Sequence, residues 1–276
     1  MARLVVPLEI RRFLRRAAIE APRRLRDLPA DILSRFSPPS PDGPMPPGKL
    51  RARVGQSSRA TFSEVGRMGC AQIVAAFERV RDPRAEYASW LDFGCGCGRL
   101  ARHVGRVSGL FESLHGVDVD PALIDWASRN LPGTYAVMNP HPPLSFGASS
   151  FDVVYAISIF THCTEQEQGE WLAELHRILR PGGLLIATTL STGRTSDFSL
   201  AAEVSEGLDR RGFACANPTG AFNERAAFHS ERYLKETWGR FFATRLHEKK
   251  GFVGYQDLSV WEKAGPRRCP IHIPGR

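Results

Sequence analysis

The sequence predicts an α/β fold built on a doubly wound, mostly parallel sheet. Three observations support this prediction: apolar runs alternate with helical patterns from residue 90 to residue 189, a glycine-rich turn follows the first run, and two more strand-like segments come near the end of the chain. Strands that alternate with helices form parallel sheets because each helix crosses one face of the sheet. Ligands of such folds bind at the carboxyl ends of the strands, so functional residues are expected there.

The predicted sheet has seven strands. Five apolar segments are the candidate parallel strands, and residues 241–248 and 255–261 form a candidate antiparallel hairpin joined by Lys249-Lys250-Gly251. Residues 151–157 are apolar on both faces, as a central parallel strand must be. The five parallel strands are expected from Trp90, at 113–118, at 135–138, at 151–157 and at 184–189.

Helices are expected between these strands. Apolar residues at helical spacing predict a helix over 60–81, ahead of the first strand. Pro121 suits the first turn of a helix that Asp120 would cap. Further helices are expected from Leu100, at 165–179 before Arg180-Pro181-Gly182-Gly183, and from the N-cap Ser230 to Trp238. Residues 190–228 are polar and dotted with glycine, and we expect them to cover the ligand-binding edge.

Composition limits the class of protein. The chain has 276 residues, 42% of them hydrophobic, which suits one α/β domain with additions. No apolar run approaches the roughly 18–20 residues of a membrane span, so no integral membrane segment is expected. The six cysteines follow no repeated CxxC spacing, which predicts a reducing, cytoplasmic location and no metal site. Cys95 and Cys97 are expected to pack beneath the glycine turn.

The predicted domain boundaries follow changes in composition. Residues 1–36 are rich in arginine and contribute strongly to the net charge of +8. This basic helical extension is either a solvated segment or a contact with an anionic membrane or another polyanion. Residues 37–59 form an expected Pro/Gly-rich linker, residues 60–264 the main domain, and residues 265–276 a tail.

The glycine-rich turn at residues 92–98 predicts a nucleoside-cofactor site. Three alternate glycines allow backbone angles that other residues resist and let a ligand approach the main chain. The N–H groups of the following helix favour a polar or anionic group at that point. Asp92 adds a carboxylate at the end of the first strand.

Four motifs in register resemble those of class I S-adenosylmethionine-dependent methyltransferases, over roughly residues 60–263. The nicotinamide dinucleotide fold is the rival, but its fingerprint requires a third glycine where this chain has Arg99. The resemblance implies a Rossmann-like fold with S-adenosyl-L-methionine as cofactor. The motifs are Asp92-Phe93-Gly94-Cys95-Gly96-Cys97-Gly98, Gly116-Val117-Asp118-Val119-Asp120-Pro121, Ser149-Ser150-Phe151-Asp152-Val153-Val154-Tyr155, and Glu174-Leu175-His176-Arg177-Ile178-Leu179-Arg180-Pro181-Gly182-Gly183.

The resemblance also implies roles for individual residues. Asp118 would accept hydrogen bonds from both ribose hydroxyls, because an ionised carboxylate offers only acceptors. Asp92 would lie near the amino group of the cofactor, and Val119 would pack beside the adenine. The remaining expected cofactor contacts are Gly94, Gly96 and Gly98 around the methionyl part, Asn139 near the adenine amine, and Ile157 and Ser158 after the fourth strand. Gly98 has an alternative role in helix–strand packing.

The acceptor is expected to be a small molecule or a glycan, methylated on a hydroxyl. Such a reaction benefits from a general base, and His162 and His229 are the candidate catalytic residues. Each has an alternative: His162 as a packing or capping residue of its loop, and His229 as part of a helix cap. Two other functions stay open, a nucleic-acid (RNA) methyltransferase tethered by the basic N-terminus and a non-catalytic S-adenosylmethionine-binding protein.

Overall fold

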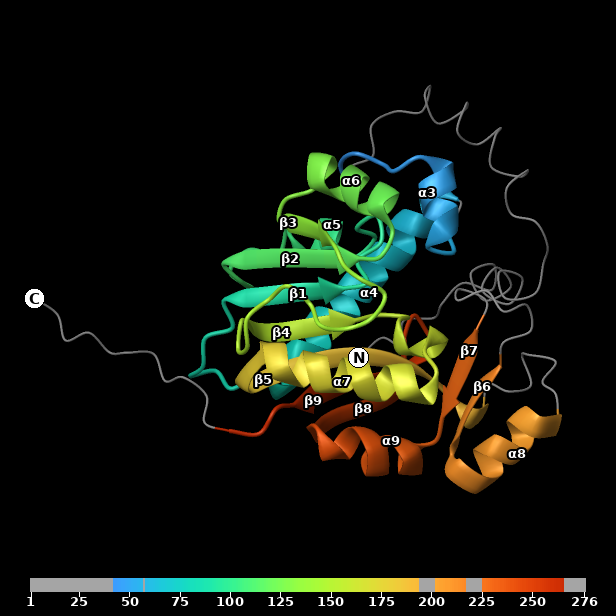
Figure 1. Cartoon of the computed structure of the whole chain (residues 1–276). Coiled ribbons are helices and arrows are strands. Elements are labelled where there is room, and N and C mark those ends of the chain that lie inside the picture. Colours follow the sequence, from blue (N-terminus) through green and yellow to red (C-terminus); the bar gives the residue numbers. More distant parts are fainter. Residues whose placement is uncertain (1–41, 57, 194–201, 217–224, 266–276) are drawn as a thin grey trace, which may run out of the picture.

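The computed structural model describes residues 42–56, 58–193, 202–216 and 225–265. The predicted basic extension at 1–36 and residues 266–276 of the predicted tail lie outside these ranges. Within them, nine strands form one sheet (Figure 1). The seven-stranded part has the order β3-β2-β1-β4-β5-β9-β8, in which β1 to β5 are parallel and β9 and β8 are antiparallel. This confirms the predicted fold class.

The strands agree closely with the predicted segments, and β2 and its prediction coincide. β4 is buried at every position, as a central parallel strand requires. The hairpin β6–β7, within the segment left unassigned from sequence, extends the sheet where β7 pairs with the end of β5. The strands are β1 (Ser89–Phe93), β2 (Ser113–Asp118), β3 (Thr134–Val137), β4 (Phe151–Ala156), β5 (Leu179–Ser191), β6 (Phe213–Ala216), β7 (Ala226–His229), β8 (Ala243–Phe252) and β9 (Gln256–Glu262).

The helices also follow their sequence signals. Asp120 accepts a hydrogen bond from Ala122 N and Ser230 accepts one from Tyr233 N, which confirms both as N-caps. The helices of more than three residues are α3 (Gly48–Arg53), α4 (Arg59–Val80), α5 (Ala101–Val104), α6 (Pro121–Asn130), α7 (Glu165–Ile178), α8 (Ala202–Arg211) and α9 (Glu231–Thr237); two short 3-10 turns are η2 (Phe160–His162) and η5 (Trp238–Arg240).

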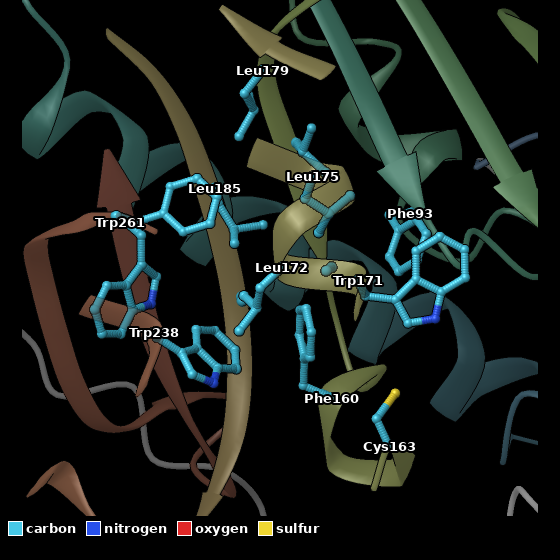
Figure 2. Packing of buried hydrophobic residues seen from close by; sticks show 14 of the residues in the cluster. Phe93, Phe160, Cys163, Trp171, Leu172, Leu175, Leu179, Leu185, Trp238 and Trp261 are labelled. Atoms are coloured by element: carbon cyan, nitrogen blue, oxygen red, sulfur yellow. The ribbon is translucent and has the colours of Figure 1, made fainter. Parts of the chain in front are cut away.

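Two apolar layers cover the two faces of the sheet. Alternate residues of β1 point to opposite faces, so Leu91 and Phe93 join one cluster while Trp90 joins the other. The first cluster packs α7 and α9 against the sheet, and the ring centroids of Phe93 and Trp171 lie 4.8 Å apart (Figure 2). The second cluster packs α4 on the other face (Figure 1).

Two buried carboxylates and the buried cysteines stabilise the fold. Asp152 accepts hydrogen bonds from Ser89 N and from the Arg180 guanidinium, which ties β4 to β1 and to the start of β5. Asp257 accepts a hydrogen bond from Lys250 N across the β8–β9 hairpin. Cys95 and Cys97 are buried, which confirms that they pack beneath the turn.

Three predictions need correction. Residues 48–53 of the predicted linker form α3, which packs on the main domain because Leu50 is buried beside Phe62 and Leu123. The predicted turn at residues 249–251 lies inside β8, which bulges there, and the chain turns at 253–255 instead. β5 begins at Leu179 and includes the Pro-Gly-Gly segment that was expected to separate helix from strand.

Candidate active site

The glycine-rich turn joins β1 to α5 at the carboxyl edge of the sheet. Gly94, Gly96 and Gly98 have φ values of +77°, +56° and +71°, which L-residues with a side chain rarely adopt. The N–H groups of Gly94 and Cys95 both donate to the Val117 carbonyl oxygen, at 2.8 and 2.9 Å. The turn is therefore fixed against the end of β2.

Each glycine of the turn also makes a close contact. A Cβ atom on Gly94 would lie 2.1 Å from Ile159 Cδ1, and one on Gly98 would lie 2.0 Å from Leu131 Cδ1. A Cβ atom on Gly96 would lie 2.6 Å from Val54 Cγ1. The packing against Leu131 favours the helix–strand packing role for Gly98.

Asp118 ends β2 and connects the glycine turn to α6. Its Oδ2 accepts a hydrogen bond from Gly96 N at 2.8 Å, and its Oδ1 accepts one from Asp120 N at 2.9 Å. Burial raises the pKa of this carboxyl, and the backbone N–H donors counteract part of the rise. Each oxygen of a carboxylate has about two lone pairs, so each retains one acceptor position for a further donor. Two neighbouring hydroxyl groups match that pair of positions.

Two exposed valines flank Asp118. Val119 follows Asp118 directly and is 44% exposed. Val137, which pairs with Asp118 between β2 and β3, is 50% exposed. They are the exposed large hydrophobic residues of the described part of the chain. Exposed apolar side chains at the carboxyl ends of adjacent parallel strands suit a flat apolar ring. Asn139 lies two residues after Val137 and is exposed at the same edge.

Asp92 lies under the glycine turn rather than on its surface. The residue is 2% exposed, and its Oδ2 has no hydrogen bond of standard geometry within the described ranges. Burial raises the pKa of the carboxyl to about 8, and the Tyr155 hydroxyl and Arg99 guanidinium offset only part of that rise. A cationic group that reached this oxygen would favour the ionised form.

The chain after β4 returns to the glycine turn. Ile157 is buried, and Ser158 has a φ of +62°, which is uncommon for a residue other than glycine. Ser158 N donates to Thr188 Oγ1 at 2.8 Å, and its hydroxyl donates to Gln256 Oε1 at 3.0 Å. These bonds hold the turn that places Ile159 over Gly94.

His162 belongs to η2, three residues beyond Ile159. Its Nδ1 lies 2.8 Å from the Arg225 carbonyl oxygen. A carbonyl oxygen only accepts, so Nδ1 carries the proton and Nε2 is the basic nitrogen of the neutral ring. Burial lowers the pKa of the imidazole, and the hydrogen bond to Arg225 counteracts part of that shift.

An ion pair holds Arg225 in place. Arg225 Nη1 donates to Glu167 Oε1 and Oε2 at 2.9 and 2.8 Å. Glu167 is also the third residue of the capping box of α7, where its carboxylate accepts from Thr164 N at 2.7 Å. The start of α7 therefore fixes the carbonyl group that orients His162.

His229 lies in the core, which corrects its expected role as a catalytic residue. It is 2% exposed and is enclosed by aromatic rings, with Phe213 and Tyr233 at 5.3 and 5.9 Å between centroids. Its Nε2 lies within hydrogen-bond distance of the Gln168 amide, and burial lowers its pKa to about 3. A side chain enclosed in this way packs β7 against α7 and does not reach an acceptor.

Most of the other predicted residues meet at one edge of the sheet. The glycine turn, Asp118, Val119 and Ser158 are linked through the contacts described above. Sequence reasoning missed Val137, Ile159 and Val54, which touch or flank these groups. Val137 and Ile159 carried a signal, since Val137 is the last residue but one of the strand predicted at 135–138 and Ile159 follows the strand predicted at 151–157, but Val54 lay in the segment interpreted as a linker.

The described ranges contain no group of three or more His, Cys, Asp or Glu side chains arranged to hold a metal ion. None of their helices is both long and apolar enough to cross a membrane.

Comparisons with known proteins match methyltransferases over part of the chain. The sequence model of a family described as "Methyltransferase domain" matches residues 91–187, from β1 to β5. The chain is 30% identical over 124 residues to the ubiquinone biosynthesis O-methyltransferase of Caulobacter sp. (strain K31), covering 44% of this chain and 48% of that protein. It is 37% identical over 107 residues to phthiotriol/phenolphthiotriol dimycocerosates methyltransferase 1 of Mycobacterium ulcerans (strain Agy99), covering 36% of each. The matches span about half the length of these relatives or less.

A solved structure has a similar fold. This is the 1,6-didemethyltoxoflavin-N1-methyltransferase of Burkholderia thailandensis, solved with 1,6-didemethyltoxoflavin and S-adenosylhomocysteine bound. Its TM-score is 0.52 at 17% identity, and the alignment covers 96% of this chain and 93% of that one. At this identity the likeness establishes the fold alone.

Proposed function

We propose, from the premise that this chain carries a class I S-adenosylmethionine-dependent methyltransferase domain, that it methylates a hydroxyl group of a small molecule or glycan. The observation that carries the cofactor part of the proposal is the geometry of Asp118. Its two oxygens are held by backbone N–H groups so that each retains an acceptor position, between two exposed valines. A ribose diol and an adenine ring have the matching chemistry.

The described residues fit the cofactor on three points. Asp118 would bind the ribose hydroxyls. Val119 and Val137 would pack against the adenine ring. The buried Oδ2 of Asp92, which has no hydrogen bond of standard geometry within the described ranges, is a candidate acceptor for the methionyl ammonium group, whose positive charge would favour the ionised form of this carboxyl. Asn139 remains a candidate contact to the adenine amine because it is exposed at the same edge.

Methyl transfer of this kind requires no covalent bond between the protein and the methyl group. When bound, S-adenosyl-L-methionine supplies a methyl group already activated by the positive charge on sulfur. The chain then has to orient the acceptor and exclude water. Ile159, which lies on Gly94, and Ser158, whose backbone is fixed by Thr188, are the residues after β4 that shape this side of the site.

His162 is the proposed general base. Its Nδ1–H donates to Arg225, so Nε2 is the nitrogen that accepts the proton of the acceptor hydroxyl. The lowered pKa keeps the ring neutral near pH 7, which is the form a base requires. Protonation of Nε2 places a positive charge near the Arg225 guanidinium, whose own charge disfavours it and so, in addition to burial, contributes to the lowered pKa of His162.

The names of several relatives support an oxygen acceptor. One Caulobacter relative is an O-methyltransferase of ubiquinone biosynthesis, and ubiquinone is a small molecule. The identity and the partial coverage transfer no particular substrate to this chain. The acceptor class is therefore the part of the proposal that needs an assay.

Two measurements test the proposal. The first is a thermal-shift titration with S-adenosylmethionine, S-adenosylhomocysteine and, as a control, NAD. Binding to the native state raises the melting temperature with ligand concentration, so both adenosyl ligands should raise it and NAD should not. The second measures transfer of a labelled methyl group to a panel of phenols, alcohols, saccharides and RNA. Label only in RNA would refute the small-molecule assignment.

A further inference from the structure

A segment ahead of the main domain crosses the proposed cofactor site. We define residues 42–56 as the strap; it contains α3 and lies beside α6 and the start of α4 (Figure 1). We propose that two strap residues, Arg53 and Val54, are positioning residues of the cofactor site, which restrain the glycine turn and the residue 118–120 turn and so slow cofactor exchange. This inference rests on the proposed function.

Val54 restrains the glycine turn. Its Cγ1 lies 2.6 Å from the position of a Cβ atom on Gly96, so the isopropyl group contacts the bare main chain of that residue. Arg99, just after the turn, donates from Nη1 to the Val54 carbonyl oxygen at 3.2 Å. The other side of Gly96 is held by Asp118, whose Oδ2 accepts its N–H. The strap and the proposed ribose ligand therefore act on the same residue.

Arg53 restrains the second turn. Its Nη1 donates to Asp120 Oδ1 and Oδ2 at 2.9 and 2.6 Å. The backbone N–H of Asp120 in turn donates to Asp118 Oδ1. Arg53 thus contacts Asp120, which orients one oxygen of the Asp118 carboxylate, the proposed ligand of the ribose hydroxyls. Its side chain is 50% exposed, and ion pairs this exposed are weak enough to break and reform readily.

The two ends of the strap are held differently. Near its beginning, Arg102 Nη2 donates to the carbonyl oxygens of Asp42, Gly43 and Pro44, at 2.9, 3.1 and 2.5 Å, and the Arg102 side chain is buried. At its end, Gly55 has a φ of +78° and no atom within 4 Å of where its Cβ would lie. Arg53 and Val54 therefore lie near the end of the strap away from the Arg102 anchor, just before Gln56, which is buried and whose N–H donates to the Arg51 carbonyl oxygen.

The test measures ligand release from the full chain and its variants. S-adenosylhomocysteine is the probe, with Kd from calorimetry and the dissociation rate from stopped-flow displacement. Arg53→Gln removes the ion pair and Val54→Ala shortens the contact with Gly96. Arg53→Lys keeps the charge and should rescue. Lys49→Gln is the matched control, because Lys49 is an exposed cation on the same helix.

The expected result is a faster release without loss of fold. Arg53→Gln should raise both Kd and the dissociation rate about twofold to fivefold, the range that an exposed ion pair contributes. Its melting temperature without ligand should fall by no more than about 4 °C, since an exposed ion pair contributes at most about 1 kcal/mol to the fold. Lys49→Gln should match the unaltered chain in all three properties. Hydrogen exchange at residues 94–98 and 118–120 should be faster in Arg53→Gln and Val54→Ala when the ligand is bound.

Two results would overturn the inference, and they differ. If the unaltered chain binds S-adenosylhomocysteine and both strap variants release it at the unaltered rate, the strap has no positioning role and the proposed function stands. If the unaltered chain binds neither adenosyl ligand, the proposed function fails and the strap inference falls with it.

Discussion

Replacement of Asp118 by alanine separates two tasks of one carboxylate. In the structure it accepts two backbone hydrogen bonds, from Gly96 and Asp120, and by our proposal it also accepts two from the ribose. Asparagine is a poor conservative variant here, because its amide NH₂ would face one of the two N–H donors. Asp118→Ala removes all four bonds and introduces no such repulsion.

The expected loss of affinity comes from the two ligand bonds. Leaving two hydroxyl groups unpaired costs about 1–3 kcal/mol, which raises the Kd of S-adenosylhomocysteine about 5-fold to 150-fold. The two backbone donors also lose a charged acceptor, which should destabilise the fold by about 2 kcal/mol and lower the melting temperature by about 4–8 °C. Binding is therefore measured well below the melting temperature of the variant.

Calorimetry with a matched control decides the outcome. Asp125→Ala removes a carboxylate from α6 that pairs only with the exposed Arg129 within the described contacts, and it should leave Kd unchanged. An analogue without the ribose 2′-hydroxyl should lose less affinity on Asp118→Ala than the parent ligand does, because the two changes remove a shared bond. An unchanged Kd in a folded Asp118→Ala variant would refute the ribose assignment.

Three further predictions concern the base, the buried carboxyl and the N-terminal segment. His162→Ala should lower turnover at least about 100-fold, because a general base typically contributes that much, and it should keep the affinity for S-adenosylhomocysteine. Equal turnover would remove His162 from the mechanism. In the unaltered chain the rate should rise with pH through an apparent pKa below the usual value near 6.5 and then level off, since burial lowers the pKa of His162. Asp92 has a raised pKa of about 8, so the native state binds more protons than the unfolded state from about pH 4 to pH 8, and stability from this group falls as pH rises through that window. The melting temperature of Asp92→Asn, relative to the unaltered chain, should therefore increase from pH 5 to pH 9, and a constant difference would contradict the pKa assignment. Deletion of residues 1–36 should preserve folding and ligand affinity, whereas deletion of residues 1–56 should weaken both because α3 and its contacts are lost; a cooperative loss of stability in the shorter deletion would contradict this.

The sequence by itself determined the fold class and indicated the residues that we propose bind the cofactor. Period-two and period-3.6 patterns depend on local chemistry, so β2, α6 and α7 could be placed to within a residue or so of their ends. The four motifs also indicated Asp118 and the glycine turn as candidate cofactor contacts. In an open parallel sheet the carboxyl ends of neighbouring strands such as β1 and β2 lie at the same edge, which brings these residues together. Capping by Asp120 and Ser230 was equally local and equally predictable.

Only the tertiary structure decided what distant segments contribute. His229 resembled a catalytic histidine in sequence, but its burial depends on rings from Phe213, Tyr233 and Trp238, which no local pattern brings together. Val54 and Arg53 lay in a proline-rich stretch that reads as a linker, and they reach the glycine turn and Asp120 because α3 packs on Phe62 and Leu123. The tautomer of His162 depends on Arg225, 63 residues away. Such contacts are set by long-range packing, which a single sequence does not encode in its spacing.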